Sequence, residues 1–236
     1  MQKKFKLVMV LALVCFAAAP ALAADTKFGA EVFGAFNSYS MSDVNDHQIK
    51  ELNDSQNTNF NDVTSGLTGG INARMWANQR WMFSAGWEPL FLETETDANG
   101  TSGKINLDGN SFQVTGAYFF PSQSNGRYGI GAGLGLYSIS GEASGDASLS
   151  STGSSQDVSG STVGFHFMGV GEWTVSPGFA ITAASGYRIA KIDDTKFDDK
   201  SYGTYPTSTQ EKLATDYSGF VGRVGLSFYL PTSSKQ

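Results

Sequence analysis

A period-two alternation of apolar residues is the feature that most limits how this chain can fold. Eight stretches rich in aromatic and β-branched residues carry apolar side chains at every second position. They span residues 27–40, 64–77, 81–93, 105–120, 128–141, 161–175, 179–192 and 216–230. Because successive side chains of a strand point to opposite faces, each stretch would present one apolar and one polar face. The chain is therefore predicted to be all-β.

The connections between these stretches alternate between short and longer ones. The short connections are residues 78–80, 121–127 and 176–178, and they contain the turn residues Asn78, Asn125-Gly126 and Pro177-Gly178. The longer connections are residues 41–63, 94–104, 142–160 and 193–215. This alternation is typical of an eight-stranded antiparallel up-and-down barrel.

The position of the charged residues distinguishes a membrane barrel from a soluble one. In the first stretch Phe28, Val32 and Phe36 share one face, and Glu31 lies on the other. The charges on the polar faces of all the stretches are Glu31, Arg74, Glu88, Glu172, Arg188 and Arg223. A soluble ligand-binding barrel would turn its apolar face inward, whereas a membrane barrel turns it toward lipid. We therefore expect a transmembrane β-barrel with long extracellular loops and short periplasmic turns.

Aromatic residues of the apolar face gather beside the short turns. This set consists of Trp81, Phe120, Tyr128, Trp173, Phe179 and Phe228. Aromatic rings are enriched at the boundary between lipid tails and headgroups. We expect these six residues to lie at the membrane interface, with both chain termini on the periplasmic side.

The first 23 residues have the pattern of a secretory signal peptide. Lys3, Lys4 and Lys6 precede an apolar run at 7–19, and the small-residue triplet 21–23 follows. We predict cleavage after Ala23, which leaves a mature barrel at 24–236. Removal of the three lysines leaves 13 basic and 22 acidic residues, a formal charge of −9. Such a balance argues against nucleic acid as a partner.

The only cysteine, Cys15, lies inside the segment predicted to be removed. The mature chain would therefore have no disulfide and no thiolate metal site. A lipoprotein with a modified Cys15 is the alternative, but Val14 is larger than the small residue expected before such a cysteine.

The six charges of the polar faces are predicted to form a salt-bridge network in the lumen. Eight strands enclose an interior just wide enough for side chains to fill, and an unpaired buried charge is costly. Counting from the short turns places Glu31, Arg74 and Glu172 in one layer. Glu88, Arg188 and Arg223 fall in a second layer farther from the turns. We interpret the network as a plug; a gate or an ion path is the alternative.

Glycines of the fifth stretch also point inward. They are Gly129, Gly131, Gly133 and Gly135. They are expected to make room for long side chains such as the arginines and Trp76, or else to leave a narrow passage.

Other candidate sites carry less weight. His166 lies in the middle of a strand and faces the lumen, but catalysis would also require a nucleophile and an orienting acid around it. The acidic groups at 43–46 and 193–199 could bind calcium, yet they lack the ordered ligand spacing of a calcium loop. We predict a hydrogen-bonding role for His166 and no catalytic residue, cofactor or metal site.

These features together resemble the small outer-membrane β-barrel superfamily, which includes opacity-type surface proteins and the barrel domain of outer membrane protein A. The resemblance covers the whole mature chain, including the final strand Gly-Arg-Val-Gly-Leu-Ser-Phe-Tyr-Leu at 222–230. It implies a Gram-negative outer membrane, contact with lipid and lipopolysaccharide, and recognition by the outer-membrane insertion machinery. Relatives commonly end on an aromatic residue, whereas here Phe228 or Tyr229 would have to replace it.

Three functions follow from this interpretation. The first is a non-enzymatic surface barrel that supports envelope integrity or adhesion, and we expect it to be a monomer because a closed barrel has no free sheet edge. The second is a narrow, porin-like channel for ions or small solutes. The third is a lipid-modifying enzyme, for which the sequence lacks the His-x-Ser pattern of lipid A deacylases.

Overall fold

The computed structural model describes residues 26–50, 53–54, 61–98, 101–122, 124–145, 156–197, 200–201 and 214–231. The predicted signal peptide, with Cys15, and Asp198-Asp199 of the acidic segment lie outside these residues. No helix within the described residues has the length and apolar character needed to cross a membrane.

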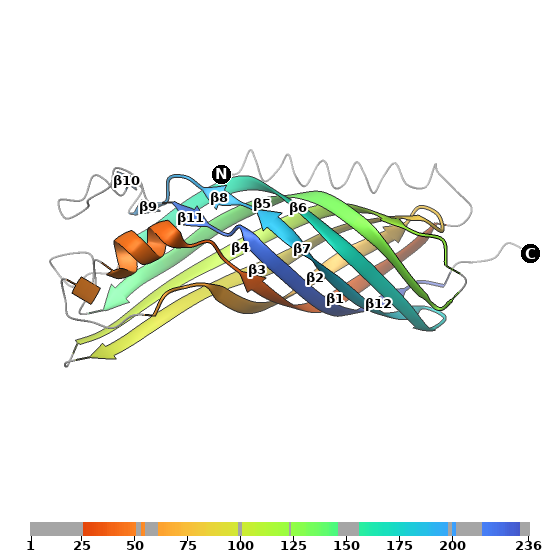
Figure 1. The fold of residues 1–236 in the computed structure, drawn as a ribbon, viewed down its shortest axis with the longest axis horizontal. Coiled ribbons are helices and arrows are strands. Elements are labelled where there is room, and N and C mark those ends of the chain that lie inside the picture. The colour runs from red at the N-terminus through yellow and green to blue at the C-terminus, as the bar shows by residue number, and fades with distance from the viewer. Residues whose placement is uncertain are drawn as a thin grey trace, which may run out of the picture.

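Eight long strands form a closed antiparallel barrel (Figure 1). They are β1 (Lys27–Ser38), β2 (Ser65–Trp76), β3 (Trp81–Ala98), β4 (Thr101–Phe119), β5 (Gly126–Gly145), β6 (Gln156–Ser176), β7 (Phe179–Ile189) and β12 (Gly219–Tyr229). Each strand from β1 to β7 pairs with the next, and β12 closes the barrel between β7 and β1. The predicted eight-stranded up-and-down topology is confirmed.

The two ends of the barrel differ. At one end, the turn end, short connections join β2 to β3, β4 to β5 and β6 to β7. Asn78 shapes the first of these turns, because its Oδ1 accepts hydrogen bonds from the backbone N–H groups of Arg80 (2.8 Å) and Trp81 (3.0 Å). In the third turn Gly178 adopts a φ of 90°, which favours glycine.

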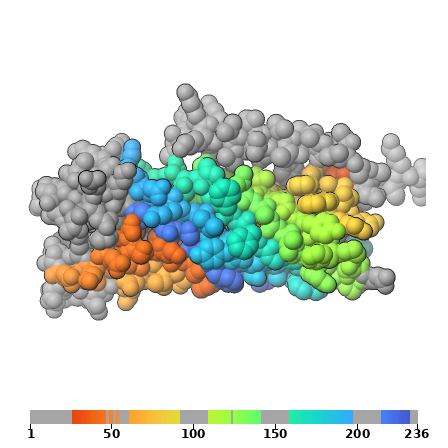
Figure 2. Space-filling view, turned by 45° about the horizontal axis from the view of Figure 1, so that its top comes forward, coloured from red at the N-terminus to blue at the C-terminus, as the bar shows by residue number. Residues whose placement is uncertain are grey.

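The opposite end, the loop end, carries the remaining short elements. They are the helical turn η2 (Val44–Ile49), β8 (Lys191–Ile192), β9 (Lys196–Phe197), β10 (Lys200–Ser201) and β11 (Thr215–Asp216). Figure 2 shows the strands packed side by side in a continuous wall, with the orange residues that follow β1 gathered at this end. Strand pairing continues here through β9, which pairs with β6, and through β8 with β11.

Several strands extend farther toward the loop end than predicted. The β3–β4 ladder continues to the pair Ala98–Thr101, through the connection expected at 94–104. Strand β5 reaches Gly145 and β6 begins at Gln156, inside the connection expected at 142–160. Backbone pairing does not require an apolar face. The alternation of apolar residues therefore predicted only the part of each strand that carries an apolar face, and not the polar extension beyond it.

The apolar face of the barrel points outward, as predicted. Leu67, Ile71 and Val224 are 78%, 55% and 65% exposed, whereas Glu88 on the inner face is 1% exposed. Two large apolar residues whose parity in the alternation predicts an outward position, Met75 of β2 and Leu136 of β5, are buried. Both have bulky neighbours in register on the two adjacent strands, Phe28 and Phe83 for Met75, and Phe112 and Val163 for Leu136.

Pro89 is accommodated near the loop end of the β2–β3 ladder. The last pair of this ladder is Ile71–Trp87, so Pro89 lies two residues beyond it. On its other side Pro89 pairs with Asn110 of β4, and the register of the β3–β4 ladder continues through this pair without interruption. The missing N–H of the proline therefore removes no hydrogen bond from the β2–β3 ladder.

Two apolar clusters occupy the interior at opposite ends. The turn-end cluster consists of Trp76, Met82, Ala117 and Phe119, with Val170 and Tyr229 packed against it. The loop-end cluster consists of Tyr39, Met41, Val44, Ile49, Val63, Leu90, Tyr137, Ile139, Val158, Ala190, Ile192 and Tyr217. The charged part of the lumen lies between these clusters.

Candidate functional site: the charged lumen

Arg74 organises the ionic layer nearest the turn end. Its Nη1 lies 3.5 Å from Glu31 Oε1 and its Nη2 lies 3.0 Å from Glu172 Oε2. Nη1 also donates a hydrogen bond to Ser227 Oγ on β12. One arginine on β2 thus joins three further strands, β1, β6 and β12, across the lumen.

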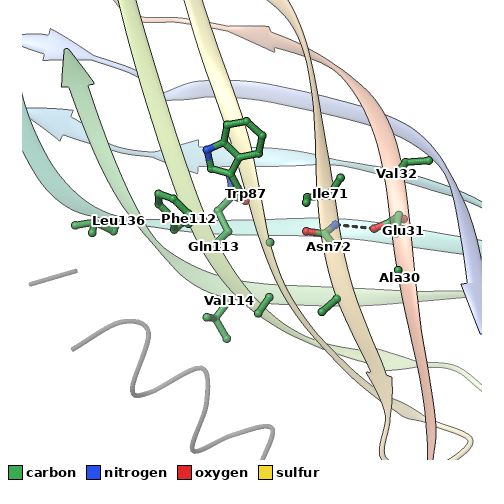
Figure 3. Close-up of a pocket in the computed structure, with 13 residues that line it drawn as sticks. Ala30, Glu31, Val32, Ile71, Asn72, Trp87, Phe112, Gln113, Val114 and Leu136 are labelled. Atoms are coloured by element: carbon green, nitrogen blue, oxygen red, sulfur yellow. Dashed lines mark hydrogen bonds between the residues drawn. The ribbon is translucent and has the colours of Figure 1, made fainter. Parts of the chain in front are cut away.

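Glu31 is held from the neighbouring strands as well. Its Oε2 accepts a hydrogen bond of 2.6 Å from Asn72 Nδ2 on β2, which is the dashed line in Figure 3. Its Oε1 accepts a hydrogen bond of 2.5 Å from Thr182 Oγ1 on β7. The carboxylate therefore has a polar partner at both oxygens in addition to Arg74.

Glu172 is the most enclosed carboxylate of this layer, with no exposed surface. Besides Arg74, it forms an ion pair with Arg127 and accepts a hydrogen bond of 2.6 Å from the Tyr229 hydroxyl. The sequence interpretation missed Arg127, which it placed in the connection 121–127. Strand β5 begins at Gly126, and Arg127 has the same parity as the inward Gly129, the signal that could have identified it.

Aromatic side chains close the lumen at the turn end. The Arg127 guanidinium lies over the Trp76 ring, 3.6 Å from its centroid, and Trp76 packs on Phe119 with ring centroids 4.7 Å apart. Trp76 Nε1 donates a hydrogen bond of 3.0 Å to the Tyr229 hydroxyl. The Arg127 guanidinium stacked on Trp76, together with the rings of Phe119 and Tyr229, therefore fills this end of the barrel.

Glu88 and Arg223 form the second ionic layer, closer to the loop end. Arg223 Nη2 lies 2.6 Å from Glu88 Oε2 and donates a further hydrogen bond of 2.8 Å to Gln113 Oε1. Glu88 also accepts hydrogen bonds from Asn37 Nδ2 (2.9 Å), Thr68 Oγ1 (2.8 Å) and Gln113 Nε2 (3.1 Å). This buried carboxylate therefore has four donors around its two oxygens.

Arg188 differs from the sequence expectation. It lies in the lumen near the second layer, but within the described residues it forms no salt bridge. Its Nε donates a hydrogen bond of 2.9 Å to the backbone oxygen of Tyr217, and its guanidinium lies 5.7 Å and 5.5 Å from the ring centroids of Tyr39 and Tyr137. The physical reason is that Glu88, the carboxylate of this layer, is already saturated by other donors.

A cavity of about 50 Å³ lies between the two ionic layers. Its lining includes the apolar side chains of Phe33, Met82 and Met168 and the hydroxyls of Ser84 and Thr115. Arg74 and Glu31 border it from one layer and Arg223 from the other. A cavity of this size has room for a few water molecules.

The inward glycines of β5 make room for side chains other than those expected. A Cβ on Gly133 would lie 2.6 Å from His166 Nε2, and one on Gly135 would lie 2.7 Å from the Tyr137 ring. The space in front of Gly133 and Gly135 is thus filled by an imidazole and a phenol. His166 Nε2 lies 2.8 Å from Thr115 Oγ1, a hydrogen bond across two strands of the lumen wall.

The six predicted interface aromatics all lie near the turn end on the outer wall. Trp81, Phe120, Tyr128, Trp173 and Phe228 are between 39% and 66% exposed, and Phe179 is half-buried against Phe228 at a centroid distance of 5.2 Å. Rings of β3, β4 and β5 form a continuous row. Centroid distances along it are 5.3 Å for Trp81–Tyr118, 5.8 Å for Tyr118–Phe120 and 5.6 Å for Phe120–Tyr128.

The outer wall also carries an apolar hollow over β1 to β5 (Figure 3). Ala30, Ala73 and Ala85 form a row of small residues in register across β1, β2 and β3. Larger residues, including Ile71 and Trp87, line the hollow beside this row. Within the described residues no three His, Cys, Asp or Glu side chains come together in a way that could hold a metal ion.

A closed barrel with an apolar wall, outward aromatics at one end and charged side chains inside defines an outer-membrane β-barrel. The chain belongs to the outer membrane protein beta-barrel domain family, whose model matches residues 9–228. Membership of this family places it in the bacterial outer membrane. No curated protein sequence matches the chain.

Solved structures of three outer-membrane barrels are similar to this chain. A major outer membrane protein from Thermus thermophilus has a TM-score of 0.52 at 11% identity and covers 87% of this chain and 99% of its own. The outer membrane protein OprG from Pseudomonas aeruginosa has a TM-score of 0.48 at 12% identity, covering 87% and 94%. Neisserial surface protein A (NspA) has a TM-score of 0.45 at 13% identity, covering 86% and 96%. At these identities the likeness concerns the fold.

Proposed function

We propose that this chain is a non-enzymatic integral outer-membrane protein with a side-chain-filled lumen, which acts through its loop end in envelope integrity or adhesion. The observation that carries the proposal is the obstruction of the lumen at four successive levels. From the turn end these are the turn-end cluster, the Arg74 layer, the Glu88–Arg223 layer and the loop-end cluster.

An ion crossing this lumen would have to separate buried ion pairs. Glu172 and Glu88 are 0% and 1% exposed, and each has several charged or polar partners. Breaking a buried pair costs about 3–5 kcal/mol because one charge is left uncompensated. Two such layers in series support a plug and argue against a permanently open pore.

In this proposal the turn end, with both chain termini, faces the periplasm and the loop end faces the cell exterior. The six outward aromatics would then lie at the periplasmic interface, and the apolar wall would contact lipid and, in the outer leaflet, lipopolysaccharide. The protein is proposed to be monomeric because β1 and β12 pair with each other and leave no sheet edge open.

A narrow channel is the second candidate function. The cavity between the two ionic layers favours it, since its polar lining could hold water along part of a path. For a channel to exist, both apolar clusters would have to open.

Single-channel recording in planar bilayers tests the proposal. The protein purified from outer membranes should show the heat-dependent gel shift of a folded barrel and should give no conductance steps. Reproducible steps that change in Arg74→Gln or Glu172→Gln, but not in the exposed control Arg80→Gln, would overturn the plug and establish the channel. Steps unaffected by any of the three changes would also overturn the proposal.

A further inference from the structure

The charges of the two ionic layers are not balanced in the same way. In the layer near the turn end, Glu31 and Glu172 face Arg74 and Arg127, so the formal charges cancel. In the second layer, among the residues that the structure describes, Glu88 is the single carboxylate beside Arg223 and Arg188. One positive charge is left over, and it belongs to Arg188, which is 1% exposed.

The surplus charge lies at the two Nη groups of Arg188. Nε is bonded to the Tyr217 backbone oxygen, but Nη1 and Nη2 are buried and have no hydrogen bond from the described residues. Tyr39 has its ring beside the guanidinium and its hydroxyl interacts with the Arg188 side chain, but it does not supply a negative charge. Burial raises the pKa of Tyr39 to about 12, so its hydroxyl stays protonated at neutral pH.

The remaining titratable groups around Arg188 do not compensate it either. Glu88 acts on Arg188 electrostatically, but its two oxygens already accept from four other donors. His166, opposite Arg188 in the β6–β7 register, cannot carry a negative charge. A buried guanidinium without a counter-ion is costly, so the position calls for an anion.

The surroundings of Arg188 toward the loop end are mostly apolar, apart from the buried hydroxyls of Tyr39, Tyr137 and Tyr217. Leu90, Ile139 and Ile192 are buried there, and they belong to the same cluster as Val44 and Ile49 of η2. We call residues 41–50, which contain η2, the lid. Its helical turn is a π-helix, a rare form that occurs frequently at functional sites.

We propose that Arg188 is the anion-recognising group of a binding site beneath the lid, and that its ligand is a small monocarboxylate with an apolar body. The two carboxylate oxygens match the two free Nη groups and would neutralise the surplus charge. The apolar body would take the place of the Val44 and Ile49 side chains beside Leu90, Ile139 and Ile192. A ligand with two negative charges is disfavoured by the nearby Glu88 carboxylate, which sets the preference for a monovalent anion.

Methyl NMR of the protein purified from outer membranes tests this site, with hexanoate as the probe. Hexanoate should cause saturable shifts of the Ile139 and Ile192 methyl signals, whereas hexanol and hexylammonium of the same chain length should not. Equal shifts with hexanol would show partition into an apolar cluster without anion recognition and would overturn the proposal. Equal saturable shifts with chloride alone would overturn the assignment of a carboxylate ligand.

Variants of Arg188 provide the second arm. Arg188→Met should weaken hexanoate binding about tenfold or more, as expected for the loss of charged hydrogen bonds, while Arg188→Lys should retain part of the affinity. Arg80→Gln, an exposed arginine at the turn end, is the control and should bind as the native protein does. If Arg188→Met fails to give the gel shift of a folded barrel, the hexanoate affinity of Arg188→Lys and the comparison of hexanoate with hexanol and hexylammonium decide whether the proposal holds. Unchanged affinity in a folded Arg188→Met variant would overturn the proposal.

Discussion

The hydroxyl of Tyr229, on the last strand, donates a hydrogen bond of 2.6 Å to Glu172 on β6, two strands away around the barrel wall. The same hydroxyl accepts a hydrogen bond from Trp76 Nε1 on β2. Strand β12 is the strand that closes the barrel against β1. Tyr229 therefore links the closing strand to two strands with which it shares no backbone ladder.

Tyr229→Phe tests this link. The change removes one hydrogen bond to a buried carboxylate and leaves Trp76 Nε1 without its acceptor, so the free energy of unfolding should fall by about 2–3 kcal/mol. The measurement is urea unfolding in lipid vesicles. Phe228→Leu, at the neighbouring outward position, is the matched control and should cost less. Equal effects of both changes would mean that the strand end matters and the hydroxyl does not.

Neutralising Glu172 should be more damaging. Glu172→Gln leaves Arg74 and Arg127 facing each other with only Glu31 as a counter-charge, and removal of one member of a buried pair costs about 3–5 kcal/mol. The temperature of the heat-dependent gel shift should fall clearly. Asp62→Asn, at an exposed position, should leave that temperature unchanged. A native transition temperature in Glu172→Gln would contradict the structural importance of this ion-pair layer.

The sequence predicted the barrel and its inner face because alternation is a local property that each strand displays by itself. Counting from the turns fixes height along a strand and put Glu31, Arg74 and Glu172 in one layer; in the structure Arg74 lies 3.5 Å from Glu31 and 3.0 Å from Glu172. Pairing was harder to predict. Arg127 was missed because the start of β5 was placed two residues late, and Arg188 lacks a salt bridge because its nearest carboxylate is saturated by neutral donors such as Asn37 and Thr68. Competition for one carboxylate is a three-dimensional property that strand parity does not encode.

Gly133, which faces the lumen, and Gly169, which faces outward on β6, provide a test of inward packing with an outward control. A Cβ added to Gly133 would meet His166 Nε2 at 2.6 Å and the Val114 backbone oxygen at 2.1 Å, whereas at Gly169 the nearest atom would be 3.8 Å away. Gly133→Ala should therefore lower the free energy of unfolding by about 1–3 kcal/mol through overpacking. Gly169→Ala should be neutral or slightly stabilising. Chemical denaturation of both variants in the same vesicles gives the comparison, and equal stabilities would contradict the packing of His166 against β5.

Ile71→Arg tests which face of the wall meets lipid. Ile71 is 55% exposed on the outer face, and its register partners Val32 and Trp87 place it away from both strand ends of β2. An arginine there should lower stability in a bilayer by about 2–4 kcal/mol, the cost of a cation near the membrane midplane. Ser65→Arg, at the loop-end start of β2, should cost at most about 1 kcal/mol because that position lies near the interface. Equal costs at the two positions, measured by unfolding from lipid vesicles, would contradict a lipid-facing outer wall. A larger cost at Ile71 in vesicles that shrinks in detergent micelles would identify the bilayer as the origin of the effect, since both media contact the same side chain.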